Sequence, residues 1–222
     1  EAIQHLRKGT IGKVYMARGL VYRWRPSIGK KNPEPCPPTH DYNLWLGPAQ
    51  QRPFSRRWVH YNWHWHWEFG NGDVGNQGIH ETDIARWFLG YNTLSPRVMS
   101  IGGRLGYDDD ANTPNTQLVY HDYDGPPLIF EVRGLPKAKE FQENKTAWSH
   151  NMDTVDGFSK NRGIGVVVVC EGGRFVVVDG GDRALAVDGQ GKTIRQFDKT
   201  DLQFGRGWTK GDHYNFASWQ QA

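Results

Sequence analysis

A histidine and an aspartate near the start of a predicted helix are the side chains in this sequence best suited to chemistry. His80 and Asp83 lie in residues 75–90, and on a helix they share one stripe with Asn76 and Trp87. An imidazole exchanges protons near neutral pH, and Asp83 or Asn76 could orient it. The stretch therefore predicts His80, Asn76 and Asp83 as a catalytic group. The alternative is a helix-start histidine that bonds only to the backbone.

A second group of imidazoles precedes this helix. If residues 61–69 are extended, their period-two alternation separates polar from aromatic side chains. The polar face would then carry His60, Asn62, His64, His66 and Glu68. Histidines two residues apart on a strand can chelate a divalent metal ion such as zinc, with His60 or His80 supplying a third nitrogen. The alternative is that these imidazoles hydrogen-bond a sugar or line a polar cleft.

Tryptophan is dense in the same part of the chain. Of ten tryptophans, six lie close together in sequence: Trp45, Trp58, Trp63, Trp65, Trp67 and Trp87. Aromatic rings stack on the apolar faces of sugar rings, which favours a carbohydrate-like ligand, although core packing must account for most of these rings. The predicted substrate-binding residues are Trp63, Trp65, His64, His66, Asn62, Gln77 and Arg104.

Other motifs exclude several kinds of site. Residues 108–110 are three aspartates without the spacing of a calcium loop, which predicts a solvated turn. Residues 102–106 are glycine-rich but lack a phosphate-loop lysine, and no G-x-G-x-x-G opens a helix after a strand. The sequence therefore encodes no dinucleotide site. A G-x-S-x-G nucleophile elbow is absent too.

Composition limits the partners and the compartment. The net charge is +3, from 27 basic and 24 acidic residues that are mixed along the chain, so nucleic acid is not implied. Cys36 and Cys170 lack metal-ligand spacing and fit a reducing compartment, which favours the cytoplasm. No apolar stretch approaches the 18 residues of a membrane helix. We expect neither nucleic acid nor a membrane as a partner.

The pattern of elements predicts an α+β fold in one domain, residues 1–222, with a large and mostly antiparallel open β-sheet and a few helices packed on one face. Helices are expected at 1–8 and 75–90, a short apolar plug at 42–48, and a polar excursion at 144–162. Tight turns join most of the predicted strands, which favours hairpins. Those strands are 11–24, 98–105, 117–123, 128–133, 165–170, 174–178 and 184–187.

Several stretches resemble the C-terminal half of Gfo/Idh/MocA oxidoreductases. They are residues 44–49, 61–65, 70–80, 83–87, 102–104, 108–110, 113–116 and 128–135. The resemblance runs from residue 1 to about 134. Beyond that it is limited to scattered glycines and the region around His213 and Phe216.

The resemblance implies a two-domain dehydrogenase. An N-terminal Rossmann domain binds NAD or NADP, and a C-terminal α/β domain binds a sugar-like substrate and often forms oligomers through its open sheet. This sequence corresponds to the second domain only, so we expect no cofactor-binding residue in it. The aspartate and histidine pair of the family's polyol dehydrogenases falls on Asn76 and His80. His80 inherits the proton-transfer role, whereas Asn76 can orient a group but cannot ionise.

Three functions follow as hypotheses. The first is the substrate-binding and oligomerising domain of an NAD(P)-dependent sugar or cyclitol oxidoreductase, without redox turnover of its own and with a homo-oligomer formed through the open sheet face. The second is a stand-alone hydrolase or lyase whose metal is held by His60, His64, His66 or His80. The third is a non-catalytic carbohydrate-binding module.

Overall fold

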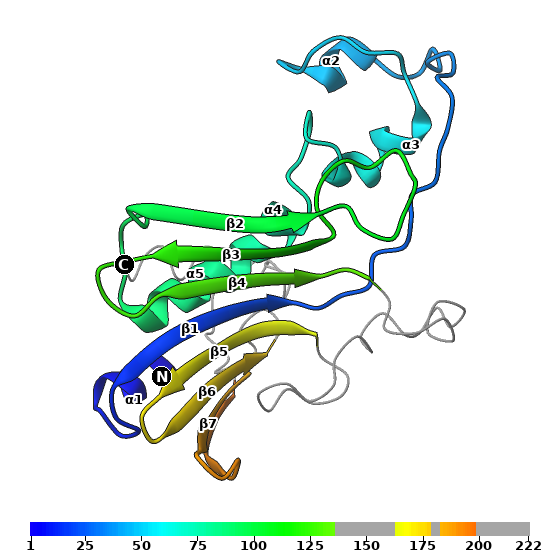
Figure 1. Ribbon diagram of the computed structural model, residues 1–222. Helices are drawn as coiled ribbons and strands as arrows, with labels where there is room; N and C mark the ends of the chain where they lie inside the picture. The colour runs from blue at the N-terminus through cyan, green and yellow to red at the C-terminus, as the bar shows by residue number, and fades with distance from the viewer. Residues whose placement is uncertain (136–162, 179–182, 199–222) are drawn as a thin grey trace, which may run out of the picture.

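A single eight-stranded sheet organises the chain. The computed structural model describes residues 1–135, 163–178 and 183–198, with the strands in the order β2-β3-β4-β1-β5-β6-β7-β8 (Figure 1). Every neighbouring pair is antiparallel except β1 and β4, which run parallel. The predicted fold class, a mostly antiparallel open sheet, is confirmed. The strands are β1 (Val14–Val21), β2 (Arg97–Gly103), β3 (Thr116–Asp122), β4 (Leu128–Arg133), β5 (Ile164–Cys170), β6 (Gly173–Val178), β7 (Arg183–Asp188) and β8 (Thr193–Asp198).

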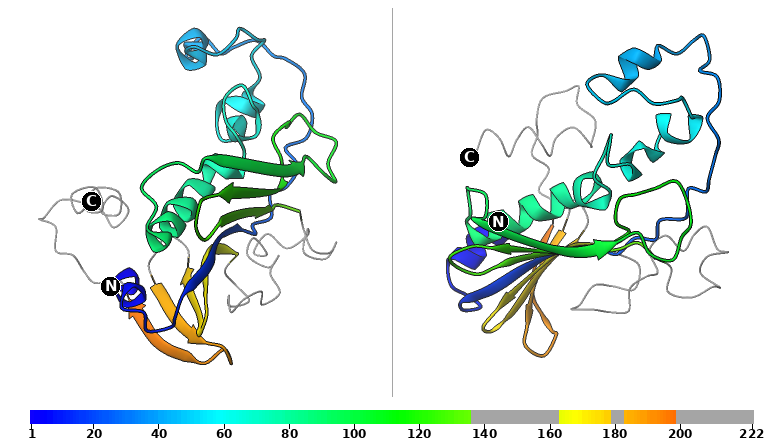
Figure 2. Two further views of the ribbon diagram at one scale, coloured as in Figure 1. Left: turned by 60° about the vertical axis from the view of Figure 1, so that its left-hand side comes forward. Right: turned by 45° about the horizontal axis from the view of Figure 1, so that its top comes forward.

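One long helix covers one face of the sheet. Helix α5 (Gly78–Leu89) lies across the central strands, and the short helix α1 (Ala2–Arg7) packs near its far end (Figure 2). The buried side of α5 is the stripe Gly78, Glu81, Ala85 and Phe88, whose spacing matches the helical repeat. The helix ends at Gly90, which has a left-handed φ of 78°.

The main core lies between α5 and the sheet. Alternate residues of the central strands point into it, and they are aliphatic or aromatic, as a half-buried sheet requires. On the opposite face, which we call the open face, a smaller cluster is buried around Tyr22 and Val167. Over β2 and β3 the same face exposes Met99, Ile101 and Leu118.

A long connection between β1 and α5 extends beyond the ends of the strands (Figures 1 and 2). We call residues 23–72 the aromatic excursion. It contains α2 (Tyr42–Leu46), α3 (Arg56–Val59) and the 3₁₀ helix η1 (Asn62–Trp65), and it leads into α4 (Asp73–Asn76). The apolar plug expected at 42–48 is the helix α2, which buries Leu46 and leaves Leu44 exposed.

Local structure differs in two places from what the sequence analysis considered. Residues 61–69 are not an extended strand, because η1 and the turn after it place His66 N–H on the Trp63 carbonyl and Gly70 N–H on the His66 carbonyl. The helix expected at 75–90 is two helices, because Gln77, with φ −115°, interrupts it. Sequence periodicity cannot register a one-residue break of this kind.

The remaining differences are smaller. Strand β8 was not expected, because most of its residues are exposed and it carries little apolar pattern. The strand expected at 11–24 is shorter, ending at Val21. The excursion expected at 144–162 and the region around His213 and Phe216 lie outside the described residues. Both cysteines are free, and no helix of the described residues could cross a membrane.

Candidate functional site

His80 stands exposed on the first turn of α5, on the side away from the sheet. Its backbone N–H donates to the Gln77 carbonyl at 3.1 Å, while its imidazole has no hydrogen-bond partner within the described ranges. Asp83 and Trp87 lie on the same outward side of α5, as the spacing predicts. The arrangement leaves the imidazole free to meet a ligand.

Asn76 does not orient His80. It belongs to α4, on the other side of the break at Gln77, and its amide donates to Asp73 Oδ1 at 3.4 Å. Gln77 instead donates to Glu81 Oε1, also at 3.4 Å. Of the predicted catalytic group, the structure therefore keeps His80 and Asp83 on one face and turns Asn76 toward a different partner.

A buried ion pair fixes the approach to α5. The Arg25 guanidinium donates to both Asp73 oxygens, with Nη2 to Oδ1 at 2.6 Å and Nε to Oδ2 at 3.0 Å. Both residues are buried, and Arg25 also donates to the Tyr61 hydroxyl and stacks 5.1 Å from the Trp65 ring centre. Burial alone lowers the pKa of Arg25, but Asp73 outweighs it and raises that pKa. The charged pair ties the excursion to α4.

Arg104, predicted as a substrate contact, belongs to a second ion pair. Its Nη2 lies 2.5 Å from Asp109 Oδ2, and that carboxylate also accepts from the Ile28 amide and the Ser27 hydroxyl. Burial opposes the charge on Asp109, but Arg104 and these donors prevail and lower its pKa. The prediction of a solvated turn at 108–110 is thus wrong for Asp109, whose side chain is 0% exposed, and holds for Asp108, which is 90% exposed.

The histidines of residues 60–66 do not share one face, because the 3₁₀ helix η1 turns their side chains in different directions. His66 is 1% exposed and packs edge-on against Trp58, and burial lowers its pKa, so the imidazole is neutral. His64 stacks on Trp63 with ring centres 3.7 Å apart, and His60 is exposed beside His40. Within residues 1–135, 163–178 and 183–198, no group of three or more His, Cys, Asp or Glu side chains is placed to hold a metal ion. The histidines of the metal-dependent hypothesis therefore form no such group among these residues.

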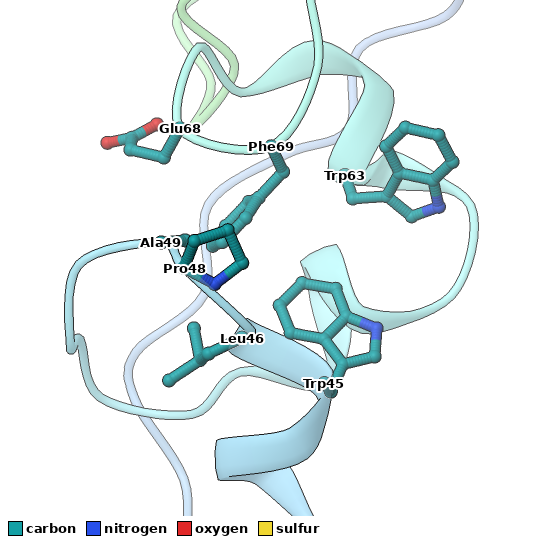
Figure 3. Close-up of a pocket in the computed structure, with 7 residues that line it drawn as sticks. All are labelled: Trp45, Leu46, Pro48, Ala49, Trp63, Glu68 and Phe69. Carbon is teal, nitrogen blue, oxygen red and sulfur yellow. The ribbon is translucent and has the colours of Figure 1, made fainter.

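The predicted substrate tryptophans have different surroundings. Trp65 is 5% exposed and packs with Ile28 and Ala111, so its faces are covered. Trp63 is half-buried and lines a pocket of about 460 Å³ in the aromatic excursion (Figure 3). The other residues lining this pocket are Trp45, Leu46, Pro48, Ala49, Glu68 and Phe69.

Sequence reasoning missed most of this pocket. Trp45 was noted only as one of many tryptophans, and Phe69 and Glu68 were assigned to opposite faces of a strand that does not form. Because η1 and the turn at 66–70 replace the strand, Glu68 and Phe69 both line the pocket. The signal that could have found it is the density of aromatic residues on both sides of the proline-rich loop.

The family of the chain follows from its sequence match to a known domain. The family model for the C-terminal α/β domain of Gfo/Idh/MocA oxidoreductases matches residues 8–148. The chain belongs to this family. Among curated proteins, none matches the sequence.

Solved structures share the fold at low identity. An oxidoreductase-family protein from Thermotoga maritima has a TM-score of 0.51 and 14% identity over 90% of this chain and 45% of its own. One from Erwinia carotovora atroseptica has a TM-score of 0.51 and 14% identity over 89% of this chain and 46% of its own. The super-repressor mutant of Gal80p from Saccharomyces cerevisiae has a TM-score of 0.50 and 11% identity over 90% and 43%. The chain spans less than half the length of each, and the likeness concerns the fold alone.

Proposed function

We propose that this chain is the substrate-binding and oligomerising domain of an NAD(P)-dependent sugar or cyclitol oxidoreductase, with His80 as the proton-transfer residue. The observation that carries the proposal is the exposed His80 on α5 inside the region that matches the family. A helix packed on a sheet holds such a side chain more precisely than a loop does. Asp83, on the same face of α5, supplies the nearby carboxylate.

The residues of this chain do the acid-base part of the reaction. The His80 imidazole accepts the proton of a substrate hydroxyl and returns it in the reverse direction, while the hydride of that carbon would pass to a nicotinamide held outside the described residues. Its place on the first turn of α5, away from the sheet, leaves room for a substrate in front of it.

The start of α5 does not suit the phosphates of a dinucleotide. A phosphate site at a helix start needs free backbone N–H groups and a close glycine approach. At the start of α5, Gly78 is covered by Phe130, whose Cζ would lie 2.3 Å from an added Cβ. The nicotinamide cofactor is therefore assigned to the dinucleotide-binding domain that accompanies this one in the family.

Substrate binding by the chain itself tests the proposal. The imidazole resonances of ¹³C-labelled protein are followed during titration with myo-inositol, D-glucose and D-galactose. We expect the His80 signals, assigned with the His80→Asn variant, to shift saturably as the ligand is added. His80 signals that stay unchanged up to the highest concentration of all three ligands would contradict the assigned role. Ile79→Ala, which alters an exposed neighbour on α5, is the matched control.

The open face supports the oligomerising role. Three apolar side chains are exposed on the adjacent strands β2 and β3: Met99 (62%), Ile101 (76%) and Leu118 (40%). Exposed apolar side chains do not stabilise a monomer, and a patch of them indicates an interface. Beside them Glu131 accepts from Tyr22 at 2.5 Å and from Arg133 at 2.6 Å, a fixed polar group next to the apolar patch. A second copy of this chain covers such a face in a self-complementary way.

The association state is measured by light scattering after size exclusion. We expect a dimer or larger species for the chain and a shift toward monomer for Ile101→Asp. Leu44→Asp is the control, because Leu44 is 79% exposed but lies on α2, away from the open face. A wild-type monomer at high micromolar concentration would remove the oligomerising part of the proposal and leave the role of His80 standing.

A further inference from the structure

The pocket in the aromatic excursion is a second place where this chain could bind a ligand. It is lined by residues 45–69, and His80, Asn76 and Asp83 are not among its lining residues. Its volume of about 460 Å³ lies within the range of small-molecule sites. We propose that this pocket binds a neutral saccharide, with the ring stacked on indole and the hydroxyls bound by Glu68. The proposal does not depend on the chemistry of His80.

The aromatic walls are held in place before any ligand arrives. Trp45 stacks on Tyr42, with ring centres 5.8 Å apart, and meets Phe69 edge-on at 4.8 Å. Trp63 stacks on His64 at 3.7 Å, and His64 Nδ1 lies 2.5 Å from the Tyr61 carbonyl oxygen. Each pocket ring thus has one side or edge occupied by protein. Rigid rings lose little conformational entropy on binding, which is the property of a preformed site.

Glu68 gives the pocket its polar side. Figure 3 shows the indoles of Trp45 and Trp63 on one side of Phe69 and the Glu68 side chain on the other, with its carboxylate at the outer edge of the pocket. A backbone hydrogen bond and the nearby Arg52 lower the pKa of Glu68, so it is ionised at neutral pH. A carboxylate accepts hydrogen bonds from two adjacent hydroxyls, which is a common way of holding a sugar ring.

Charge favours a neutral ligand over an organic cation. An aromatic pocket with a carboxylate would suit a quaternary ammonium group if the carboxylate were unpaired. Here Arg52 Nη1 lies 3.3 Å from Glu68 Oε1, and its guanidinium is held over Trp58 at 3.8 Å and near Phe69 at 5.7 Å. A second cation would be repelled by Arg52. A polyhydroxylated ring keeps the pair intact and uses the free lone pairs of Glu68.

Saturation-transfer NMR and tryptophan fluorescence test the proposal on the intact chain. The probes are cellobiose and methyl β-D-glucopyranoside, with tetramethylammonium as the cationic alternative. We expect saturable binding of cellobiose in the millimolar range, with transfer strongest to the ring C–H protons. Trp63→Ala should weaken it about tenfold, as the loss of one stacking face predicts.

Matched variants separate the pocket from other effects. Glu68→Gln keeps the shape of the side chain and should weaken cellobiose several-fold without changing the thermal midpoint. Trp67→Ala removes an exposed indole of the same segment that does not line the pocket, and it should leave cellobiose binding unchanged. Absence of saccharide binding, binding unaffected by Trp63→Ala, or preferential binding of tetramethylammonium would each overturn the proposal.

Discussion

The layer formed by α5 and the sheet differs from the aromatic excursion in what holds it together. The layer buries aliphatic strand residues such as Val166 and Val168 against Phe130 and Phe88. Apolar burial of this kind is strong but without direction. The excursion has only small apolar clusters and is fixed instead by charged pairs and ring contacts, which have definite geometry.

The two regions accordingly suit different parts of a function. A tightly packed layer can hold an exposed side chain such as His80 on a rigid helix without using it for stability. An excursion fixed by directional contacts can present several rings around an open pocket. If this comparison is right, variants in the two regions should fail in different ways.

The largest effect is expected from Asp73→Ala. Removing this carboxylate leaves Arg25 buried without its charged partner, which costs about 3–5 kcal/mol. Because six of the ten tryptophans lie in residues 23–72, fluorescence reports mainly on the excursion, whereas far-ultraviolet circular dichroism reports on the sheet and α5. In urea, the fluorescence transition should move to lower concentration than the dichroism transition.

Asp108→Ala is the matched control for that experiment. Asp108 pairs with Lys30 on the surface and is 90% exposed, so its loss should leave both transitions in place. If the Asp73 variant shifted the two transitions by the same amount, the excursion and the layer would unfold as one unit. The comparison between the regions would then be broken.

A smaller effect, in the other region, is expected from Gly78→Ala. The added Cβ would lie 2.3 Å from Phe130 Cζ, so the helix or the ring must move, at about 1–3 kcal/mol. Here the dichroism and fluorescence transitions should shift together, because the core under α5 is common to the whole fold. Adding Phe130→Leu should recover part of the loss. Gly103→Ala, where a Cβ meets only Leu105 at 3.5 Å, should be nearly neutral.

The same difference explains what the sequence could predict. The strands and the buried face of the layer follow from alternation and spacing, and seven of its eight strands were expected. In residues 61–69 an equally regular alternation predicted a strand that does not form. Alternation of polar and apolar side chains indicates that a segment could form a strand. It does not show whether a neighbouring strand is available to pair with it. In the excursion the chain pairs with itself in turns.

The candidate site shows the same limit. His80 and Asp83 lie on one face of α5, as helical spacing predicts, because that spacing is local; Asn76, expected on the same stripe, belongs to α4. Residue spacing predicts neither the Arg104–Asp109 pair nor the Arg25–Asp73 pair. These partners are held together by the connections around them, and nothing in residue spacing identifies them. The pocket of Trp45, Trp63 and Glu68 depends on the same connections.

Acid should weaken the excursion through Asp109. Its pKa is lowered in the folded chain, so the stability it contributes is present above the ordinary aspartate pKa of about 3.9 and is lost as pH falls from there through the lowered value. Urea midpoints followed by fluorescence between pH 6 and pH 3 should fall less steeply for Asp109→Asn than for the wild type. An unchanged pH dependence in that variant would exclude the Arg104–Asp109 pair as the source.

The smallest effect on stability, and the most informative about function, is expected from His80→Ala. The imidazole is exposed and has no hydrogen-bond partner among the described residues, so the free energy of unfolding should change by no more than about 0.5 kcal/mol. Ala85→Ser, on the buried side of the same helix, should cost clearly more because it places a hydroxyl in the core. A marked loss of stability in the His80 variant would mean that the side chain is part of the packing of the layer. Unchanged stability with lost response to myo-inositol is the result that separates a functional histidine from a structural one, and it would locate the function on the rigid region and not on the excursion.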